Sequence, residues 1–163
     1  RIENMIDSLE SKTQQLSALE SIMLNHHITE VSVLEGRPIG KGWLSSHYGI
    51  RKDPFSGMPS MHKGLDFAAK EGEKVIATGA GLVTWAGSRY GYGNLVEIDH
   101  GDGLVTRYGH NKQTSVKIGD VVTKGQEIAL VGNTGRSTGA HVHYEVLRHG
   151  KQQDPLPFVY NKR

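Results

Sequence analysis

The sequence of 163 residues contains no cysteine. This absence excludes thiolate metal sites, cysteine nucleophiles and disulfide frameworks, but it does not fix the compartment of the protein. Long apolar runs are also missing: hydrophobic residues make up 36% of the chain, and runs such as residues 128–131 are short. No segment is therefore expected to span a bilayer, and we expect no secretory signal within these residues.

The charge balance bears on the class of partner, and the first residue bears on whether the sequence is part of a longer chain. The formal net charge is only +2, which does not indicate a nucleic-acid binder, so we predict no nucleic-acid partner. The chain begins with Arg1 rather than methionine. We therefore interpret the sequence as a processed or cut piece, and we expect any membrane anchor only upstream of it.

The first 35 residues differ in composition from the rest. All 21 glycines, 5 prolines, 2 tryptophans, 6 tyrosines and 3 phenylalanines follow Glu35. The first 35 residues carry a net charge of −4, whereas residues 36–163 carry +6. We therefore divide the chain into residues 1–35, an N-terminal helix with the end of a coiled coil and a linker, and residues 36–163, a separate folded domain.

An apolar stripe with alternating spacings of three and four predicts a helix that continues to about His26. The stripe consists of Ile2, Ile6, Leu9, Leu16 and Met23. Because so narrow a stripe needs a partner, we favour a coiled-coil end that self-associates or binds a protein partner. Packing of the helix on the following domain remains the alternative.

Residues 36–163 are typical of an all-β domain. Short β-prone runs lie at residues 75–77, 82–85, 95–98, 104–108, 127–131 and 141–146, and glycine-bearing turns separate them. Strands at this spacing with such turns indicate antiparallel sheets in a sandwich or barrel. No stretch after Glu35 has a helical period long enough to add a helical layer.

Four histidines and one aspartate of this domain are candidates for a metal site. His141 and His143 are two residues apart in a predicted strand, so their side chains leave the same face. His62 and Asp66 are four residues apart, and imidazole with carboxylate is a good ligand pair for zinc. His110 ends the run that begins at residue 104. Each pattern alone is a weak signal, because it is more often that of a surface or salt-bridged side chain.

The neighbours of these residues predict which faces they occupy. Val142 and Tyr144 alternate with the strand histidines and are expected on the core side. By the same alternation, Tyr108 is expected to share a face with His110. Glu145 lies on the face of the strand histidines, where it either orients one of them or forms a structural salt bridge.

Together the candidates supply two imidazoles and one carboxylate as ligands and leave two imidazoles for proton transfer. Three protein ligands leave one position of a tetrahedral zinc ion open for water, which is the arrangement of a catalytic site. A structural zinc site needs four ligands, usually with thiolates, and this chain has none.

Longer motifs surround these candidates. They are MHKGLDF at 61–67, YGYGN at 90–94, IDHG at 98–101, RYGH at 107–110, VKIGDVV at 116–122 and GNTGRSTGAHVHYE at 132–145. In this order they resemble the lysostaphin-type, LytM-like zinc metallopeptidases that cut bacterial peptidoglycan, over about residues 38–158. His47, Asn111 and Val142 depart from the residues usual in that family, and none of them stands at a ligand position.

The resemblance implies a LytM-type peptidase domain that binds one Zn2+ per chain. It implies His62, Asp66 and His143 as the zinc ligands and His110 and His141 as the catalytic histidines. The implied activity is hydrolysis of peptidoglycan cross-links, as a D,D-endopeptidase on D-alanyl–diaminopimelate bonds. The implied location is extracytoplasmic, in the periplasm or cell envelope.

Two other function classes remain open. Some relatives of this family have lost metal ligands and activate cell-wall amidases, often with an attached coiled coil; the intact candidate residues here argue against that role. A carrier domain of the biotinyl or lipoyl kind is suggested by residues 116–126. That alternative needs a lysine at a hairpin tip between hydrophobic flanks, which the sequence lacks.

Overall fold

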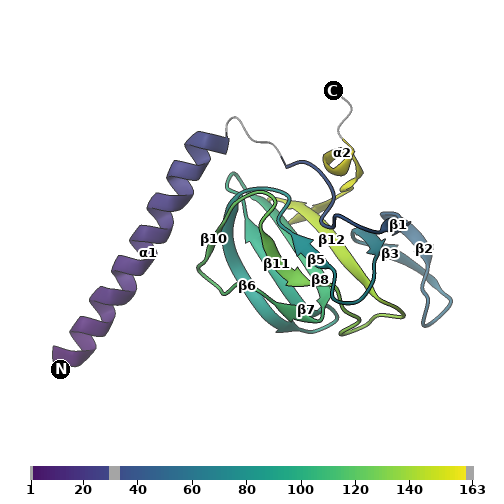
Figure 1. The fold of residues 1–163 in the computed structure, drawn as a ribbon, viewed down its shortest axis with the longest axis horizontal. Helices are drawn as coiled ribbons and strands as arrows, with labels where there is room; N and C mark the ends of the chain where they lie inside the picture. Colours follow the sequence, from purple (N-terminus) through teal and green to yellow (C-terminus); the bar gives the residue numbers. More distant parts are fainter. Residues whose placement is uncertain (1, 30–33, 161–163) are drawn as a thin grey trace.

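The computed structural model describes residues 2–29 and 34–160, and it shows one long helix beside a β-rich body (Figure 1). The helix α1 runs over Ile2–Thr29, three residues beyond His26, and lies next to strands β6 and β10 of the body. The predicted helix is therefore confirmed. In the described part of the chain, no helix combines the length and the hydropathy needed to cross a bilayer.

The apolar stripe of α1 is largely exposed to solvent. Ile2, Leu9 and Leu16 keep 62–74% of their surface accessible. The side chain of Met23, the last member of the stripe, lies outside the described residues. Self-association or partner binding through this helix remains a prediction.

The body is built on one large antiparallel sheet. Its strands follow the order β1-β4-β12-β8-β7-β6-β10, and β13 pairs with the end of β12. Their bounds are β1 Trp43–Ser46, β4 Leu65–Ala68, β6 Gly81–Arg89, β7 Gly93–Asp99, β8 Leu104–Asn111, β10 Val121–Val122, β12 His141–Arg148 and β13 Lys151–Gln153. The central position of β12, between β4 and β8, brings residues from three distant motifs into neighbouring strands.

Two smaller sheets and one short helix complete the body. A three-stranded sheet contains β5 Lys74–Ile76, β11 Glu127–Leu130 and β9 Gln113–Thr114. A two-stranded hairpin is formed by β2 Gly49–Lys52 and β3 Pro59–His62, and the helix α2 covers Leu156–Val159. The predicted all-β, sandwich-like class with an N-terminal helix is therefore confirmed.

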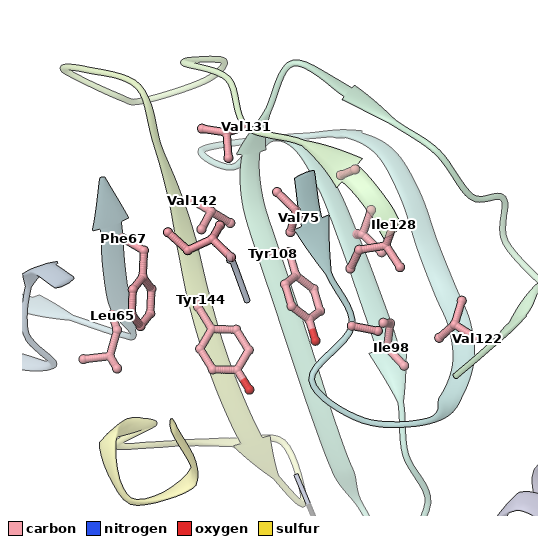
Figure 2. Packing of buried hydrophobic residues seen from close by; sticks show 14 of the residues in the cluster. Leu65, Phe67, Val75, Ile98, Tyr108, Val122, Ile128, Val131, Val142 and Tyr144 are labelled. Carbon is pink, nitrogen blue, oxygen red and sulfur yellow. The ribbon is translucent and has the colours of Figure 1, made fainter. Parts of the chain in front are cut away.

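The hydrophobic core lies between the large sheet and the three-stranded sheet. Val75 and Ile128 of the smaller sheet and Tyr108, Val142 and Tyr144 of the larger one are fully buried in a single cluster (Figure 2). Burial of such side chains stabilises the fold by about 1.5–3 kcal/mol each for the aliphatic ones. As predicted, Val142 and Tyr144 face this core, so the residues that alternate with them point to the opposite face of β12.

The predicted placement of His110 on the same face as Tyr108 is wrong. Tyr108 packs in the core against Tyr144 with ring centroids 5.3 Å apart, whereas the ring of His110 lies 4.8 Å from that of His141 on the opposite face. The register between β7 and β8 shifts by one residue between Asn94 and Val96, and His110 has a left-handed φ of 64°. A β-bulge with such a residue interrupts the alternation of side chains and turns His110 to the other face.

Candidate metal centre

Three candidate ligands meet on the face of the large sheet opposite the core. His62 ends β3, Asp66 lies in β4, and His143 is the register partner of Asp66 in β12. Asp66 Oδ1 lies 2.8 Å from His143 Nδ1 and 3.1 Å from His62 Nε2, and the two ring nitrogens are 3.3 Å apart. One donor atom from each residue therefore falls within 4.8 Å of the others, and the three side chains are largely buried.

Close backbone packing allows the loop between His62 and Asp66 to reach this position. A Cβ on Gly64 would lie 2.2 Å from the carbonyl oxygen of Tyr144, in the neighbouring strand β12. Only glycine leaves room for this approach. The glycine in the 61–67 motif thus has a direct structural role in presenting both polar side chains.

Hydrogen bonds fix which nitrogen of each ligand histidine faces the cluster. His62 Nδ1–H donates to the backbone oxygen of His47 at 2.7 Å, which leaves the Nε2 lone pair directed at the other two ligands. His143 Nε2–H donates to Glu145 Oε1 at 2.9 Å, so its Nδ1 lone pair faces the cluster when the ring is neutral. Two oriented imidazoles and one carboxylate fit a divalent transition metal such as zinc.

The protonation states at this cluster are set by burial and by close opposite charges. Burial alone raises the pKa of Asp66, but its hydrogen bonds with His143 and His62 outweigh burial and hold that pKa far below its usual range. Burial lowers the pKa of His143, but the carboxylates of Asp66 and Glu145 outweigh it and raise the pKa to about 9. A cation bound at His143 Nδ1 therefore competes with a proton for the same lone pair.

The two remaining predicted residues, His110 and His141, stand beside this cluster. His110 Nδ1–H donates to the backbone oxygen of Thr134, and His141 Nδ1–H donates to that of Gly139, each at 2.7 Å. Both rings therefore present Nε2 as the nitrogen free to exchange a proton, and His141 Nε2 lies 3.6 Å from Asp66 Oδ1. Burial, reinforced by nearby histidines, lowers the pKa of His110 to about 4, so its ring is neutral at pH 7.

All five predicted residues line one open groove of about 500 Å³. The hairpin of β2 and β3 borders the groove on one side and the loop before β12 borders it on another. Across its rim, Arg136 Nη2 donates to both carboxylate oxygens of Asp53 at 2.9 Å, and Arg136 Cζ lies 4.6 Å from the centroid of the Phe55 ring. Because the groove is open to the surface, an extended peptide can reach His62, Asp66 and His143 from outside.

Several residues of the site were missed by sequence reasoning. Arg51 Nη2 lies 3.6 Å from Asp66 Oδ2, the carboxylate oxygen that does not face the histidines. Tyr92, within the YGYGN motif, donates its hydroxyl hydrogen to Glu145, and Arg107 lies against both. Glu145 fulfils both predicted alternatives, because it accepts from His143 and also pairs with Arg107 at 3.5 Å.

Comparison with known proteins identifies the family. Residues 60–155, more than half of the chain, match peptidase family M23. The chain belongs to this family. The M23 chain is 41% identical over 113 residues to the DD-carboxypeptidase/endopeptidase Mpg of Neisseria meningitidis, an alignment that covers 69% of this chain and 26% of that protein. The chain therefore spans only about a quarter of the length of this relative.

Solved structures of M23 relatives share the fold. A zinc-containing peptidase from Vibrio cholerae superposes with a TM-score of 0.70 at 38% identity, covering 75% of this chain and 39% of that one. The catalytic domain of the antimicrobial peptidase lysostaphin from Staphylococcus simulans gives a TM-score of 0.66 at 34% identity, covering 72% and 91%. The resemblance predicted from the motifs is confirmed.

Proposed function

We propose that residues 36–163 form a zinc-dependent endopeptidase domain that hydrolyses peptide cross-links of bacterial peptidoglycan. The observation that carries this proposal is the convergence of His62, Asp66 and His143 at one point of the groove, with two further histidines beside them. The name of the Neisseria relative supports a D,D-bond as the target, and we propose the D-alanyl–diaminopimelate bond.

In this proposal His62 Nε2, Asp66 Oδ1 and His143 Nδ1 hold one zinc ion. Bound there, zinc supplies Lewis-acid chemistry that polarises the scissile carbonyl and lowers the pKa of water. The protein contributes the orientation: the carbonyl of His47 and the carboxylate of Glu145 fix the two imidazole rings. The groove aligns the peptide across the cluster.

His110 and His141 are proposed to move the protons. Each ring is held through Nδ1, and each offers Nε2 toward the groove. A neutral ring accepts a proton from water at Nε2, and a protonated ring delivers one to the leaving amine nitrogen. The low pKa of His110 keeps its ring neutral at pH 7 and able to accept a proton, and a protonated Nε2–H of either ring also stabilises the oxyanion of the tetrahedral intermediate.

The alternative function is that of an activator of cell-wall amidases. An activator requires neither oriented zinc ligands nor two poised histidines, and this chain retains all five side chains. Elemental analysis of the purified protein separates the two functions. We expect about one zinc ion per chain, and a purified chain that contains no metal would contradict the proposal. We also propose that the helix α1 is the surface for self-association or for binding a protein partner. Because peptidoglycan lies outside the cytoplasm, we propose that the domain acts there, in the periplasm or cell envelope.

Fragments released from defined muropeptides provide the direct test. Mass analysis is expected to show cleavage at the D-alanyl–diaminopimelate bond, loss of cleavage with a chelator, and recovery on adding zinc. We expect His62→Ala and His143→Ala to be inactive, while His149→Ala, on the exposed turn after β12, retains activity. Full activity and bound zinc in either ligand variant would show that the ligand assignment is wrong.

A further inference from the structure

A cluster of charged and hydroxyl side chains lies directly behind His143. Glu145 follows two residues later on the same face of β12 and is only 1% exposed. Its Oε1 accepts from His143 Nε2–H at 2.9 Å, and the Tyr92 hydroxyl lies 3.1 and 3.2 Å from its two oxygens. Every oxygen of this buried carboxylate therefore has a donor, as a buried charge requires.

The rest of the cluster follows from the register of three neighbouring strands. Glu145 of β12 is the register partner of Arg107 in β8, and Arg107 is the partner of Glu97 in β7. Arg107 Nε donates to Glu97 Oε2 at 2.7 Å, while its Nη1 lies 3.3 Å from the Tyr92 hydroxyl and 3.5 Å from Glu145 Oε2. Antiparallel pairing thus holds an acidic, a basic and an acidic side chain in one row.

We propose that Glu145, held by Tyr92 and Arg107, is a positioning residue that directs the Nδ1 lone pair of His143 toward the bound metal. This inference rests on the proposed ligation by His143. Glu145 keeps the single hydrogen of the neutral ring at Nε2, because a carboxylate can only accept a hydrogen bond. Tyr92 and Arg107 prevent the carboxylate from rotating away, and a ring fixed in this way loses less freedom when it binds the metal.

The geometry distinguishes this role from that of a simple structural ion pair. An ion pair with Arg107 would satisfy Glu145 Oε2 alone, but the closest contact of Glu145 is made by Oε1 to the histidine ring. Tyr92 also lines the groove, so it joins the buried pair to the open side of the site. Changes in this cluster should therefore alter metal affinity, whereas changes to a purely structural ion pair would alter stability alone.

Zinc affinity of the full chain, measured by competition with a chromophoric chelator, tests the inference without any substrate. We expect Glu145→Gln to weaken zinc binding by about 10–100-fold and Tyr92→Phe by about 2–10-fold. Tyr108→Phe is the matched control, because it removes a buried hydroxyl that faces the core instead. It should lower stability and leave zinc affinity unchanged.

Cobalt spectra and unfolding curves complete the test. The visible absorption of Co2+ bound in place of zinc should change in Glu145→Gln and remain as in the wild type in Tyr108→Phe. If Glu145→Gln does not fold, Tyr92→Phe decides alone, since Tyr92 is only partly buried. Folded variants whose zinc affinity equals that of the wild type overturn the inference. A wild-type chain that binds zinc but cleaves no muropeptide overturns the proposed function and leaves this inference standing.

Discussion

The pH dependence of stability offers a prediction that centres on His100, away from the groove. His100 follows β7, where its Nδ1–H donates to the backbone oxygen of Ala80 and its Nε2 lies near Thr106 Oγ1, both at 2.7 Å. Burial lowers the pKa of His100 from 6.5 to about 4, more strongly than the bond to Ala80 and the charge of Asp99 raise it.

The sign of the effect follows from the two pKa values. Because the pKa is lower in the folded state, the unfolded chain takes up this proton first as the pH falls. The stabilisation is therefore complete above about pH 6.5 and is lost as the pH falls toward 4. For a shift of this size, the contribution of His100 decreases by about 2 kcal/mol between pH 7.5 and pH 5.

Urea unfolding of the wild type and of His100→Gln isolates this contribution from that of every other titrating group. At pH 7.5 the variant should be less stable, because it loses well-made hydrogen bonds. At pH 5 the difference between the two proteins should shrink by about 2 kcal/mol. The exposed His149→Gln serves as the surface control, and a chelator keeps all samples free of metal. A difference that stays constant from pH 7.5 to pH 5 would refute the reasoning.

Two further changes test the packing and the orientation of the candidate ligands. Gly64→Ala brings a methyl group against the backbone oxygen of Tyr144, so we expect thermal unfolding to show that the free energy of unfolding falls by at least about 2 kcal/mol. Gly139→Ala is the control, because open space surrounds Gly139 and its free energy of unfolding should change little. Arg51→Gln removes the cation that faces Asp66 Oδ2, so we expect zinc binding, measured by chelator competition, to weaken by a few-fold; unchanged affinity would show that Arg51 does not orient this carboxylate.

The strands that the sequence revealed are those with one face in the core. The run at residues 141–146 became β12, and its alternation of buried apolar and polar side chains was visible because Val142 and Tyr144 have no contact with solvent. The hairpin of β2 and β3 was not predicted. Its cross-strand partners Ile50 and Met61 are both exposed, so neither strand has a core-facing period to detect.

The cluster behind His143 could not be predicted from the sequence for a different reason. Glu97, Arg107 and Glu145 are far apart in the chain, and they become neighbours only through the register of three strands. A shift of one residue in either pairing would send one of them to the core face. Tyr92 gave a weaker signal, because the YGYGN motif indicates a turn but not the direction of its aromatic ring.

His110 shows where the alternation of a strand fails as a guide to the face of a side chain. Alternation assumes a regular strand, and a regular strand would have placed His110 in the core beside Tyr108. The backbone of the motif is irregular: a Cβ added at Gly109 would lie 3.3 Å from the Tyr92 ring, and His110 adopts a left-handed φ. Such a backbone is costly for a non-glycine residue and persists where the surrounding contacts determine it, commonly at functional sites. The bulge that interrupts the alternation of β8 is therefore the feature that brings His110 to the groove.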